Sequence, residues 1–337
     1  MIRRIVNIWH PAIYQGTNRM RAHFEGWYFK LVDRQGKNIY AVIPGVSFDK
    51  QGDAHCFIQL LNGKDASSKY FRYDISSFRY SDKTFQLWVG QSYFSSDKVE
   101  INISDAETSI SGTLIFDGII PWPSTACSPG AMGWYAFMPF MECYHAVVSF
   151  NHDIKGGLKI DGCYIDFNGG LGYIEKDWGR SFPYYYVWSQ SNHFGQPGTS
   201  IMVSIANIPW LGGAFDGFMV GFLCGEHLYR FTTYNGASID ELKVDTQSLT
   251  AGFTSRGYYL QVEAHKSSAT DLAAPNEGAM EGRIAESMTS EIHVKLCRLE
   301  RGHERLIFEG SGRNAGLEIT GEIARFKQVT RSRQCDA

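Results

Sequence analysis

The chain has 337 residues, a formal net charge of −3, 44% hydrophobic residues and 14% aromatic residues. This composition supports a sizeable core and lacks the basic excess that marks a nucleic-acid-binding surface. There is no apolar run of 18 residues to span a membrane, and the N-terminus lacks the apolar core of a signal peptide. Seven cysteines without a C-x-x-C pair favour reduced thiols in a cytoplasmic protein.

Short strand-like runs separated by turn residues fill the N-terminal half. Residues 33–37 and 49–53 have the Asp/Gly/Lys composition of hairpin connections. No helical segment intervenes, which predicts an antiparallel meander and argues against βαβ units. The predicted strands are 27–32, 39–48, 55–61, 69–73, 84–89, 91–94, 98–103, 108–116, 144–150 and 162–168.

Residues 117–141 interrupt this rhythm. The prolines at positions 121, 123 and 129 are poor strand formers, and tryptophan, phenylalanine and methionine are frequent in the segment. A solvated linker would not carry so many apolar side chains. We therefore interpret residues 117–141 as a lid or plug over an apolar opening.

A second meander of about barrel size follows. Residues 267–287 are rich in Ala, Gly and Glu and are expected to form a surface excursion. The two meanders predict an all-β protein with two antiparallel barrels or sandwiches side by side, divided into domains 1–168 and 169–337. The predicted strands of the second half are 184–192, 200–208, 217–223, 227–234, 247–254, 258–265, 291–299, 305–310 and 317–322.

Two segments have an unusual density of polar and aromatic side chains. Residues 175–183 read Glu-Lys-Asp-Trp-Gly-Arg-Ser-Phe-Pro and continue to a Trp-Ser-Gln-Ser-Asn-His-Phe run at 188–194. Residues 24–30 read Phe-Glu-Gly-Trp-Tyr-Phe-Lys. An ordinary strand does not need so many hydrogen-bonding groups, so the two segments predict one site built from two halves of the fold.

These segments, together with Glu142 and His145, resemble the tocopherol cyclase family. The resemblance extends from about residue 15 to the final strands. It implies two lipocalin-like barrels with few short helices, and in the plant members it implies closure of a prenylated hydroquinone to a chromanol. This chain departs from the plant motif at Asp177, where an amide is expected, and at Ser191, where a cysteine is expected, and these departures leave the substrate open.

Such a cyclisation needs an acid that protonates a trisubstituted alkene in an apolar place, where burial raises a carboxyl pKa. Asp177 and Glu175 are the first candidates for that acid, followed by Glu25 and Glu142. Residues 175 and 177 lie on one face of an extended strand. Alternatively, both acids form ion pairs with basic neighbours such as Lys176, which would be a purely structural role.

His145 is a candidate to orient a phenol or to carry a proton, with a hydrogen-bonded core histidine as the alternative. Gln190 and Asn192 share a strand face and suit quinol hydroxyls, or they satisfy buried backbone groups. Core packing is favoured over cavity lining for Trp27 and Trp188. The residues assigned to substrate binding are Trp27, Tyr28, Glu142, Lys176, Trp178, Trp188, Gln190 and Asn192.

The leading hypothesis is therefore a cofactor-independent, tocopherol cyclase-like enzyme that holds an isoprenoid in an apolar cavity, without a metal. A non-catalytic lipocalin-like carrier of a hydrophobic ligand is the main alternative, since the same barrel suits both. A third hypothesis keeps the acid but changes the reaction to hydration or isomerisation of an alkene. The expected partner is a hydrophobic small molecule, whose extraction from a membrane would involve transient membrane contact.

Overall fold

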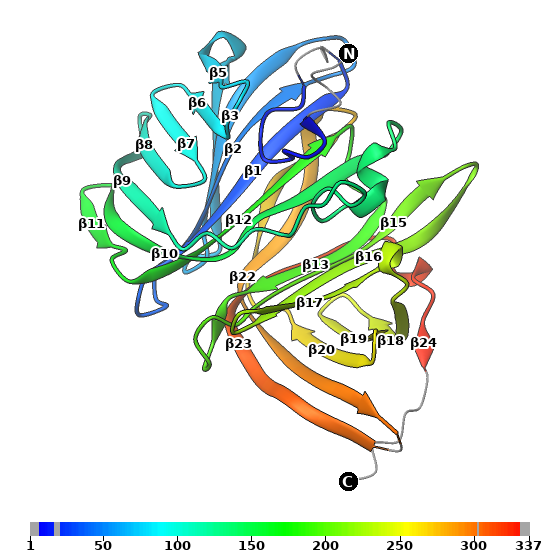
Figure 1. The fold of residues 1–337 in the computed structure, drawn as a ribbon. Coiled ribbons are helices and arrows are strands. Elements are labelled where there is room, and N and C mark those ends of the chain that lie inside the picture. Colours follow the sequence, from blue (N-terminus) through cyan, green and yellow to red (C-terminus); the bar gives the residue numbers. More distant parts are fainter. Residues whose placement is uncertain (1–6, 17–20, 302, 331–337) are drawn as a thin grey trace. The chain divides into compact units, whose positions relative to one another are not determined.

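The computed structural model describes residues 7–16, 21–301 and 303–330 and is built almost entirely from antiparallel strands (Figure 1). It contains two compact units: unit 1 comprises Met1–Phe182 with Asp271–Ile284, and unit 2 comprises Pro183–Thr270 with Ala285–Ala337. The predicted all-β fold class is confirmed. The described residues include four short 3₁₀ helices, η1 (Ile75–Ser77), η2 (Gly133–Phe137), η3 (Thr233–Asn235) and η4 (Ile323–Arg325).

Unit 1 is organised around one antiparallel sheet with the strand order β4-β3-β2-β1-β12-β10-β9-β8-β7-β6-β5, in which β11 pairs with β10. Neighbours along the chain are mostly neighbours in the sheet, as expected for a meander, except that β12 inserts between β1 and β10. The strands are β1 (His23–Val32), β2 (Ile39–Phe48), β3 (Ala54–Asn62), β4 (Ser67–Asp74), β5 (Phe78–Tyr80), β6 (Gln86–Val89), β7 (Ser92–Ser95), β8 (Lys98–Ser104), β9 (Ser109–Asp117), β10 (Cys143–Ile160), β11 (Cys163–Asp166) and β12 (Gly170–Gly179).

Alternation of apolar and polar residues decides which face of this sheet forms the core. In β8, Val99, Ile101 and Ile103 are buried, whereas Glu100 and Asn102 between them are exposed. Side chains two apart share a face, so this pattern turns one face inward along the whole strand. Members of a single core come from both ends of the sheet, which therefore curls around it; they include Trp27, Phe29, Val42, Ile58, Leu87, Phe94, Leu114, Ile154 and Ile174.

Unit 2 is organised around a second antiparallel sheet with the order β17-β16-β15-β13-β23-β22-β20-β19-β18-β24. Its core contains Val187, Phe222, Phe253, Leu260 and Val294. In this sheet β14 pairs with β23 and β21 pairs with β22. The strands are β13 (Tyr185–Ser191), β14 (His193–Phe194), β15 (Ser200–Trp210), β16 (Gly213–Cys224), β17 (His227–Thr232), β18 (Ser238–Val244), β19 (Ser248–Ser255), β20 (Tyr258–His265), β21 (Ala269–Asn276), β22 (Ala279–Glu300), β23 (His303–Gly321) and β24 (Val329–Thr330).

The β21–β22 hairpin contributes its tip to unit 1. Gln59 accepts a hydrogen bond from the Ala273 N–H at 2.9 Å, Ser47 donates to the Gly278 carbonyl at 2.8 Å, and Ser181 accepts from the Glu277 N–H at 2.8 Å. Residues 267–287 are therefore mainly paired strands, and the expected surface excursion is wrong. The units also divide after residue 182, not after 168, because β12 pairs with β1 and β10.

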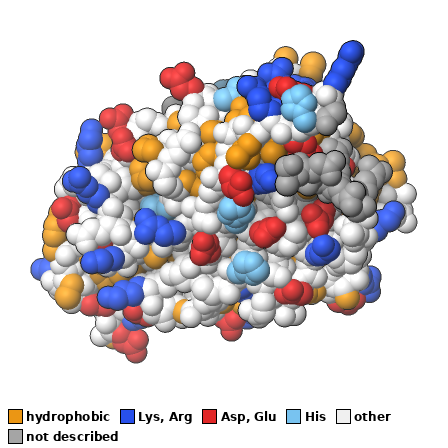
Figure 2. All heavy atoms as spheres, turned by 90° about the horizontal axis from the view of Figure 1, so that it is seen from below, with side chains coloured by type: hydrophobic (Ala, Val, Ile, Leu, Met, Phe, Trp, Pro, Cys, Tyr) orange, Lys and Arg blue, Asp and Glu red, His pale blue; other side chains and the backbone are white. Residues whose placement is uncertain are grey.

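Charged side chains of both signs are interspersed over the face shown in Figure 2. This mixture of charges differs from the basic stripe along one element that is typical of a nucleic-acid-binding surface. In the part of the chain that the structure describes, no helix is long and apolar enough to cross a bilayer.

His152 of β10 makes the stability of unit 1 dependent on pH. Its Nδ1 lies 3.0 Å from Ser149 Oγ, its ring lies 4.5 Å from the Phe116 ring, and a side chain at Gly172 would collide with it. Burial lowers the pKa of His152 to about 3. In the unfolded chain His152 is protonated below about pH 6.5, whereas in the folded protein it stays neutral until a much lower pH. The free energy of unfolding therefore decreases as the pH falls below that value.

We expect His152 to contribute a loss of about 1.4 kcal/mol per pH unit between ~pH 6 and ~pH 4. Urea denaturation at each pH measures this slope. His152→Asn should remove that part of the slope, whereas His227→Asn, which changes an exposed histidine of unit 2, should leave it unchanged. Equal slopes in the wild type and His152→Asn would contradict the assignment.

Candidate functional site

The two polar and aromatic segments of the sequence form neighbouring strands. In the β1–β12 pair, Glu25 lies opposite Trp178, Trp27 opposite Lys176 and Tyr28 opposite Glu175. Directly opposed residues of an antiparallel pair share a face, and successive residues alternate between faces. The polar side chains are therefore divided into two clusters on opposite faces of one sheet, although the two segments do lie side by side.

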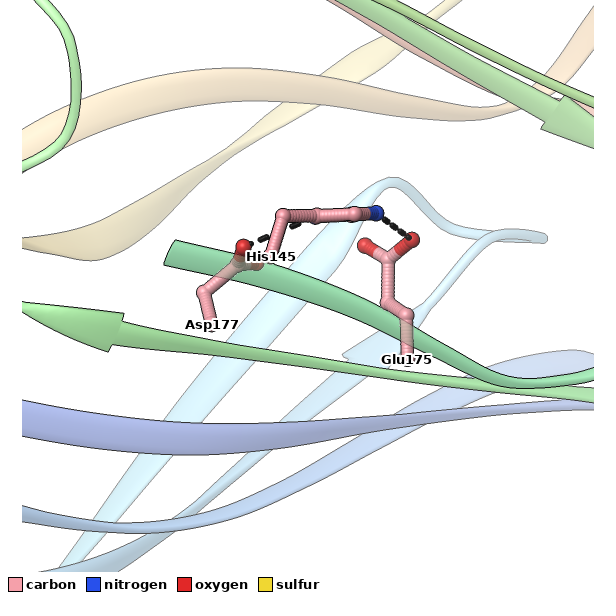
Figure 3. Close-up of side chains that lie close together, drawn as sticks. All are labelled: His145, Glu175 and Asp177. Atoms are coloured by element: carbon pink, nitrogen blue, oxygen red, sulfur yellow. Dashed lines mark hydrogen bonds and ion pairs between the residues drawn. The ribbon is translucent and has the colours of Figure 1, made fainter. Parts of the chain in front are cut away.

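The first cluster lies on the face of β12 that points away from the core of unit 1. His145 on β10 lies directly opposite Asp177. Its Nδ1 is 2.8 Å from Asp177 Oδ1 and its Nε2 is 3.6 Å from Glu175 Oε2, so the imidazole lies between two carboxylates (Figure 3). His145 and Glu175 are buried, while Asp177 is partly exposed.

Tyr173 completes this cluster. It lies two residues before Glu175 on the same face, and its hydroxyl donates a hydrogen bond to Glu175 Oε2 at 2.6 Å. Burial, and then the charge of Glu175, raises the pKa of Tyr173 well above its ordinary value. The tyrosine therefore stays protonated and acts only as a donor toward the carboxylate.

His145, Glu175 and Asp177 also have the residue types of a metal site, because one ligand atom of each lies within 4.8 Å of the others. The 2.8 Å separation of His145 Nδ1 from Asp177 Oδ1 is a hydrogen-bond distance that holds the proton on Nδ1. A ligating histidine commonly binds through one nitrogen while the other donates to a carboxylate. In this arrangement His145 Nε2 and the Glu175 carboxylate face each other at 3.6 Å.

The second cluster lies on the core side of the same strands and is held together by an ion pair and hydrogen bonds. Lys176 Nζ contacts Glu25 Oε2 at 2.6 Å and donates to the carbonyls of Ile13 at 2.6 Å and Pro11 at 3.1 Å. His23 Nε2 lies 2.9 Å from Glu25 Oε1. Burial alone would raise the pKa of Glu25, but Lys176 and His23 outweigh it and hold the pKa below its usual range.

Burial lowers the pKa of Lys176 to about 8, with Glu25 opposing the shift. Both members of the pair are therefore charged at neutral pH. Lys176 Nζ also lies 4.6 Å from the ring centroid of Trp27 and 4.7 Å from that of Trp178. The Trp178 ring also stacks on Tyr144, with the ring centroids 5.3 Å apart. These rings already stabilise a cation of the protein itself, which favours a structural role for them.

An apolar pocket of about 180 Å³ lies at the start of β10. Of the first cluster, His145 is among its lining residues, next to Tyr144 and Trp178. Much of the remaining wall comes from the proline-rich segment predicted to be a lid or plug, through Pro129, Ala131, Met132, Ala136, Phe137, Met138 and Pro139. The volume is below the range of roughly 300–1,000 Å³ typical of sites for whole drug-sized ligands, so it suits one ring of a larger molecule.

The remaining predicted residues lie outside these two clusters. Glu142 precedes β10, and burial, only partly opposed by Arg180, raises its pKa. Trp188 and Gln190 lie in β13 of unit 2, with Asn192 just after it, and all three are buried. They occupy the face of the strand opposite Val187, which belongs to the core of unit 2. Their assignment to substrate binding stays a prediction.

Sequence reasoning missed Tyr173 and His23. Tyr173, Glu175 and Asp177 follow the period of two that places side chains on one strand face, so this alternation was the available signal for Tyr173. His23 stands two residues before Glu25 and follows the same rule. Each of these hydrogen bonds joins residues two apart in one strand, Tyr173 with Glu175 in β12 and His23 with Glu25 in β1.

Known proteins share both the sequence pattern and the fold. A family model described as tocopherol cyclase-like matches residues 104–321, well over half of the chain. A probable chloroplastic tocopherol cyclase of Oryza sativa subsp. japonica is 22% identical over 58% of this chain and 43% of its own length, and the chloroplastic tocopherol cyclase of Zea mays is 25% identical over 56% and 41%. The alignments thus span less than half the length of these relatives.

The fold resembles the crystal structure of CghA with Sch210972, with a TM-score of 0.53 and 11% identity over 89% of this chain and 88% of that one. At this identity the likeness concerns the fold alone, which is lipocalin-like, as predicted. The family model, in contrast, matches the sequence itself over the whole span from β9 to β23. The chain therefore belongs to the tocopherol cyclase-like family.

Proposed function

We propose that this protein is an enzyme that closes a prenylated hydroquinone, or a similar isoprenoid with a phenol and a trisubstituted alkene, to a chromanol-type product. The observation that carries the proposal is His145, which lies between Asp177 and Glu175 and also lines the apolar pocket. Membership of the tocopherol cyclase-like family supports a reaction of the cyclase type. The pocket would hold the aromatic ring, because its volume suits one ring.

Each member of the first cluster has a distinct role in this proposal. Glu175, in its carboxylic acid form, gives its proton to the less substituted alkene carbon, which leaves a tertiary cation on the other carbon. The phenol oxygen then forms the C–O bond while its proton passes to His145 Nε2, and His145 returns a proton to Glu175 over the 3.6 Å between them. No atom is gained or lost overall, so the reaction is an isomerisation.

Asp177 and Tyr173 act through these two groups. Asp177 fixes the proton on His145 Nδ1, which leaves Nε2 as the acceptor that faces the phenol. The Tyr173 hydroxyl stabilises the Glu175 carboxylate that forms when the alkene is protonated. Tyr28, which lies opposite Glu175 on the same face, is placed to offer an aromatic ring to the cation.

The test is an incubation of the full chain with a panel of prenyl hydroquinones in D₂O, followed by mass spectrometry. Cyclisation should give a product with the mass of the substrate plus one carbon-bound deuterium. Hydration would add one water molecule, and alkene migration would leave the phenol free. Saturable binding of the panel without any product would overturn the enzyme proposal in favour of a carrier.

A parallel assay with a chelator tests the expectation that the reaction needs no metal. We expect the rate of product formation to be unchanged after EDTA treatment and gel filtration. A loss of activity that Mg²⁺, Mn²⁺ or Zn²⁺ restores would instead assign His145, Glu175 and Asp177 to a cation, since their ligand atoms lie within 4.8 Å of one another.

A further inference from the structure

Unit 2 contains its own cavity, with a volume of about 730 Å³. It opens where β13 and β16 begin and where β15 ends, and the chain after β23 forms part of its wall. This volume falls within the range of roughly 300–1,000 Å³ typical of small-molecule sites. The cavity uses none of the residues assigned above to the reaction.

The inner part of this cavity is apolar. Phe218 and Leu242 line it and are at the same time members of the unit 2 core. Phe215, Ile239 and Val329 extend the apolar wall toward the opening and are partly exposed. A ligand that covered these side chains would remove their apolar surface from water, which is the main favourable contribution to binding at such a site.

Three polar side chains converge on one side of the cavity. The Tyr185 hydroxyl donates to Asp216 Oδ1 at 2.8 Å and accepts from Asn207 Nδ2 at 3.2 Å. Asp216 Oδ2 accepts from the Lys327 N–H at 3.2 Å. A carboxylate has about four acceptor positions, so the partly exposed Asp216 retains the capacity to accept from a ligand.

The residues that line the cavity include one carboxylate, Asp216, and two cations, Arg325 and Lys327. Burial and the hydrogen bond to Asp216 raise the pKa of Tyr185, so its hydroxyl stays neutral while the neighbouring carboxylate carries the negative charge. Arg325 at the rim is engaged with Glu322, with Nε 2.6 Å from Oε2. A ligand group that donates a hydrogen bond without bringing a negative charge therefore matches the polar side of the cavity.

The rim of the cavity is largely uncharged at one turn, which favours a ligand that is apolar apart from its hydrogen-bonding group. Residues 208–215, at the turn between β15 and β16, contain no charged residue, and Leu211 at the tip is 83% exposed. Ala214 and Phe215 of the same turn line the cavity. An apolar molecule that enters over this turn meets no charged side chain of the turn before it reaches Asp216.

We propose that unit 2 binds, in this cavity, an uncharged apolar small molecule with a hydroxyl group, an alcohol or a phenol, whose O–H donates to Asp216. The apolar body packs on Phe218, Leu242 and Ile239, and the hydroxyl joins the Asn207–Tyr185–Asp216 chain of hydrogen bonds. This is a second binding site, wholly inside unit 2, and it holds whether or not the cyclisation proposed for unit 1 takes place.

The test compares two fluorescent probes that differ only in the hydrogen-bond donor, 2-naphthol and 2-methoxynaphthalene, titrated against the full chain. We expect saturable binding of 2-naphthol and binding of the ether that is weaker by about tenfold or more, the effect of losing a hydrogen bond to a charged group. Asp216→Asn should reduce this preference severalfold. Equal affinities of the two probes in the wild type would overturn the proposal.

A cavity-filling pair of variants locates the binding. Ile239→Trp should abolish this class of 2-naphthol sites, because the indole would occupy the cavity. Ile307→Trp, at a similarly half-buried position that packs against the core of unit 2 away from the cavity, should retain it, with circular dichroism confirming that both variants are folded. Unchanged binding in a folded Ile239→Trp, or no saturable binding in the wild type, would overturn the proposal.

Discussion

Replacing Lys176 by methionine is expected to lower the free energy of unfolding of the protein by about 3–5 kcal/mol, the usual cost of removing one partner from a buried ion pair. Methionine keeps the length of the side chain but leaves the Glu25 carboxylate, which is fully buried, without its closest cation. The carbonyls of Ile13 and Pro11 also lose their hydrogen-bond donor. Urea denaturation followed by tryptophan fluorescence measures the change.

Two further variants make this expectation specific. Lys155→Met removes an exposed lysine from a surface ion pair with Asp117 at 3.3 Å and should change stability by less than about 1 kcal/mol. The double variant Glu25→Gln with Lys176→Met removes both charges and should regain part of the loss. A loss in Lys176→Met no greater than in Lys155→Met would contradict the role of Lys176 as a buried structural cation.

The double variant also tests the predicted roles of Glu25 as an acid and Lys176 as a substrate-binding group. If it folds and turns over a prenyl hydroquinone at nearly the wild-type rate, neither residue takes part in the chemistry, as their complete pairing in the structure favours. A folded double variant without turnover would indicate that at least one of the two residues takes part in the reaction.

Glu175→Gln is expected to lower kcat about 100-fold or more, the usual contribution of a general acid, which corresponds to ~2.7 kcal/mol of transition-state stabilisation. The amide keeps the size of the side chain and still accepts from Tyr173, but it has no carboxyl proton to give to the alkene. KM should change much less, because the contacts of the ring in the pocket beside His145 are retained.

The control for this variant is Glu100→Gln, which removes an exposed carboxylate that pairs with Lys98 in unit 1, and it should turn over substrate at the wild-type rate. His145→Asn should also lose turnover, because it removes the acceptor for the phenol proton. Retained turnover in Glu175→Gln would exclude Glu175 as the acid. The remaining candidates for the acid would then be Asp177 and Glu142, the other carboxyl groups of this region.

Much of the fold follows from local pattern. The period-two alternation of β8, with Val99, Ile101 and Ile103 directed inward, is visible in the sequence and predicts an antiparallel sheet with one buried face. The same rule places Glu175 and Asp177 on one face of an extended strand and Lys176 on the other from their spacing alone. The chemical character of the two polar segments and their family resemblance were likewise accessible from the residues.

The register between distant strands was not accessible in this way. His145 meets Asp177 because β10 pairs with β12, and that pairing includes register shifts between Val147 and Ser149 and again before His152. Because a shift by one residue exchanges the two faces of a strand, no pattern within a single strand shows which side chains it will bring together. The addition of the β21–β22 tip to unit 1 is non-local for the same reason.

The sequence by itself thus determined that residues 24–30 and 175–183 are unusually rich in polar and aromatic side chains. It also determined that the fold is all-β and that the chain resembles one family. Only the tertiary structure decided that the two segments are adjacent strands, with Glu25 and Lys176 on the core side and Glu175, Asp177 and His145 on the other. The physical reason is that alternation is a local property of an extended chain, whereas the partner across each hydrogen-bonded pair depends on the packing of the whole sheet.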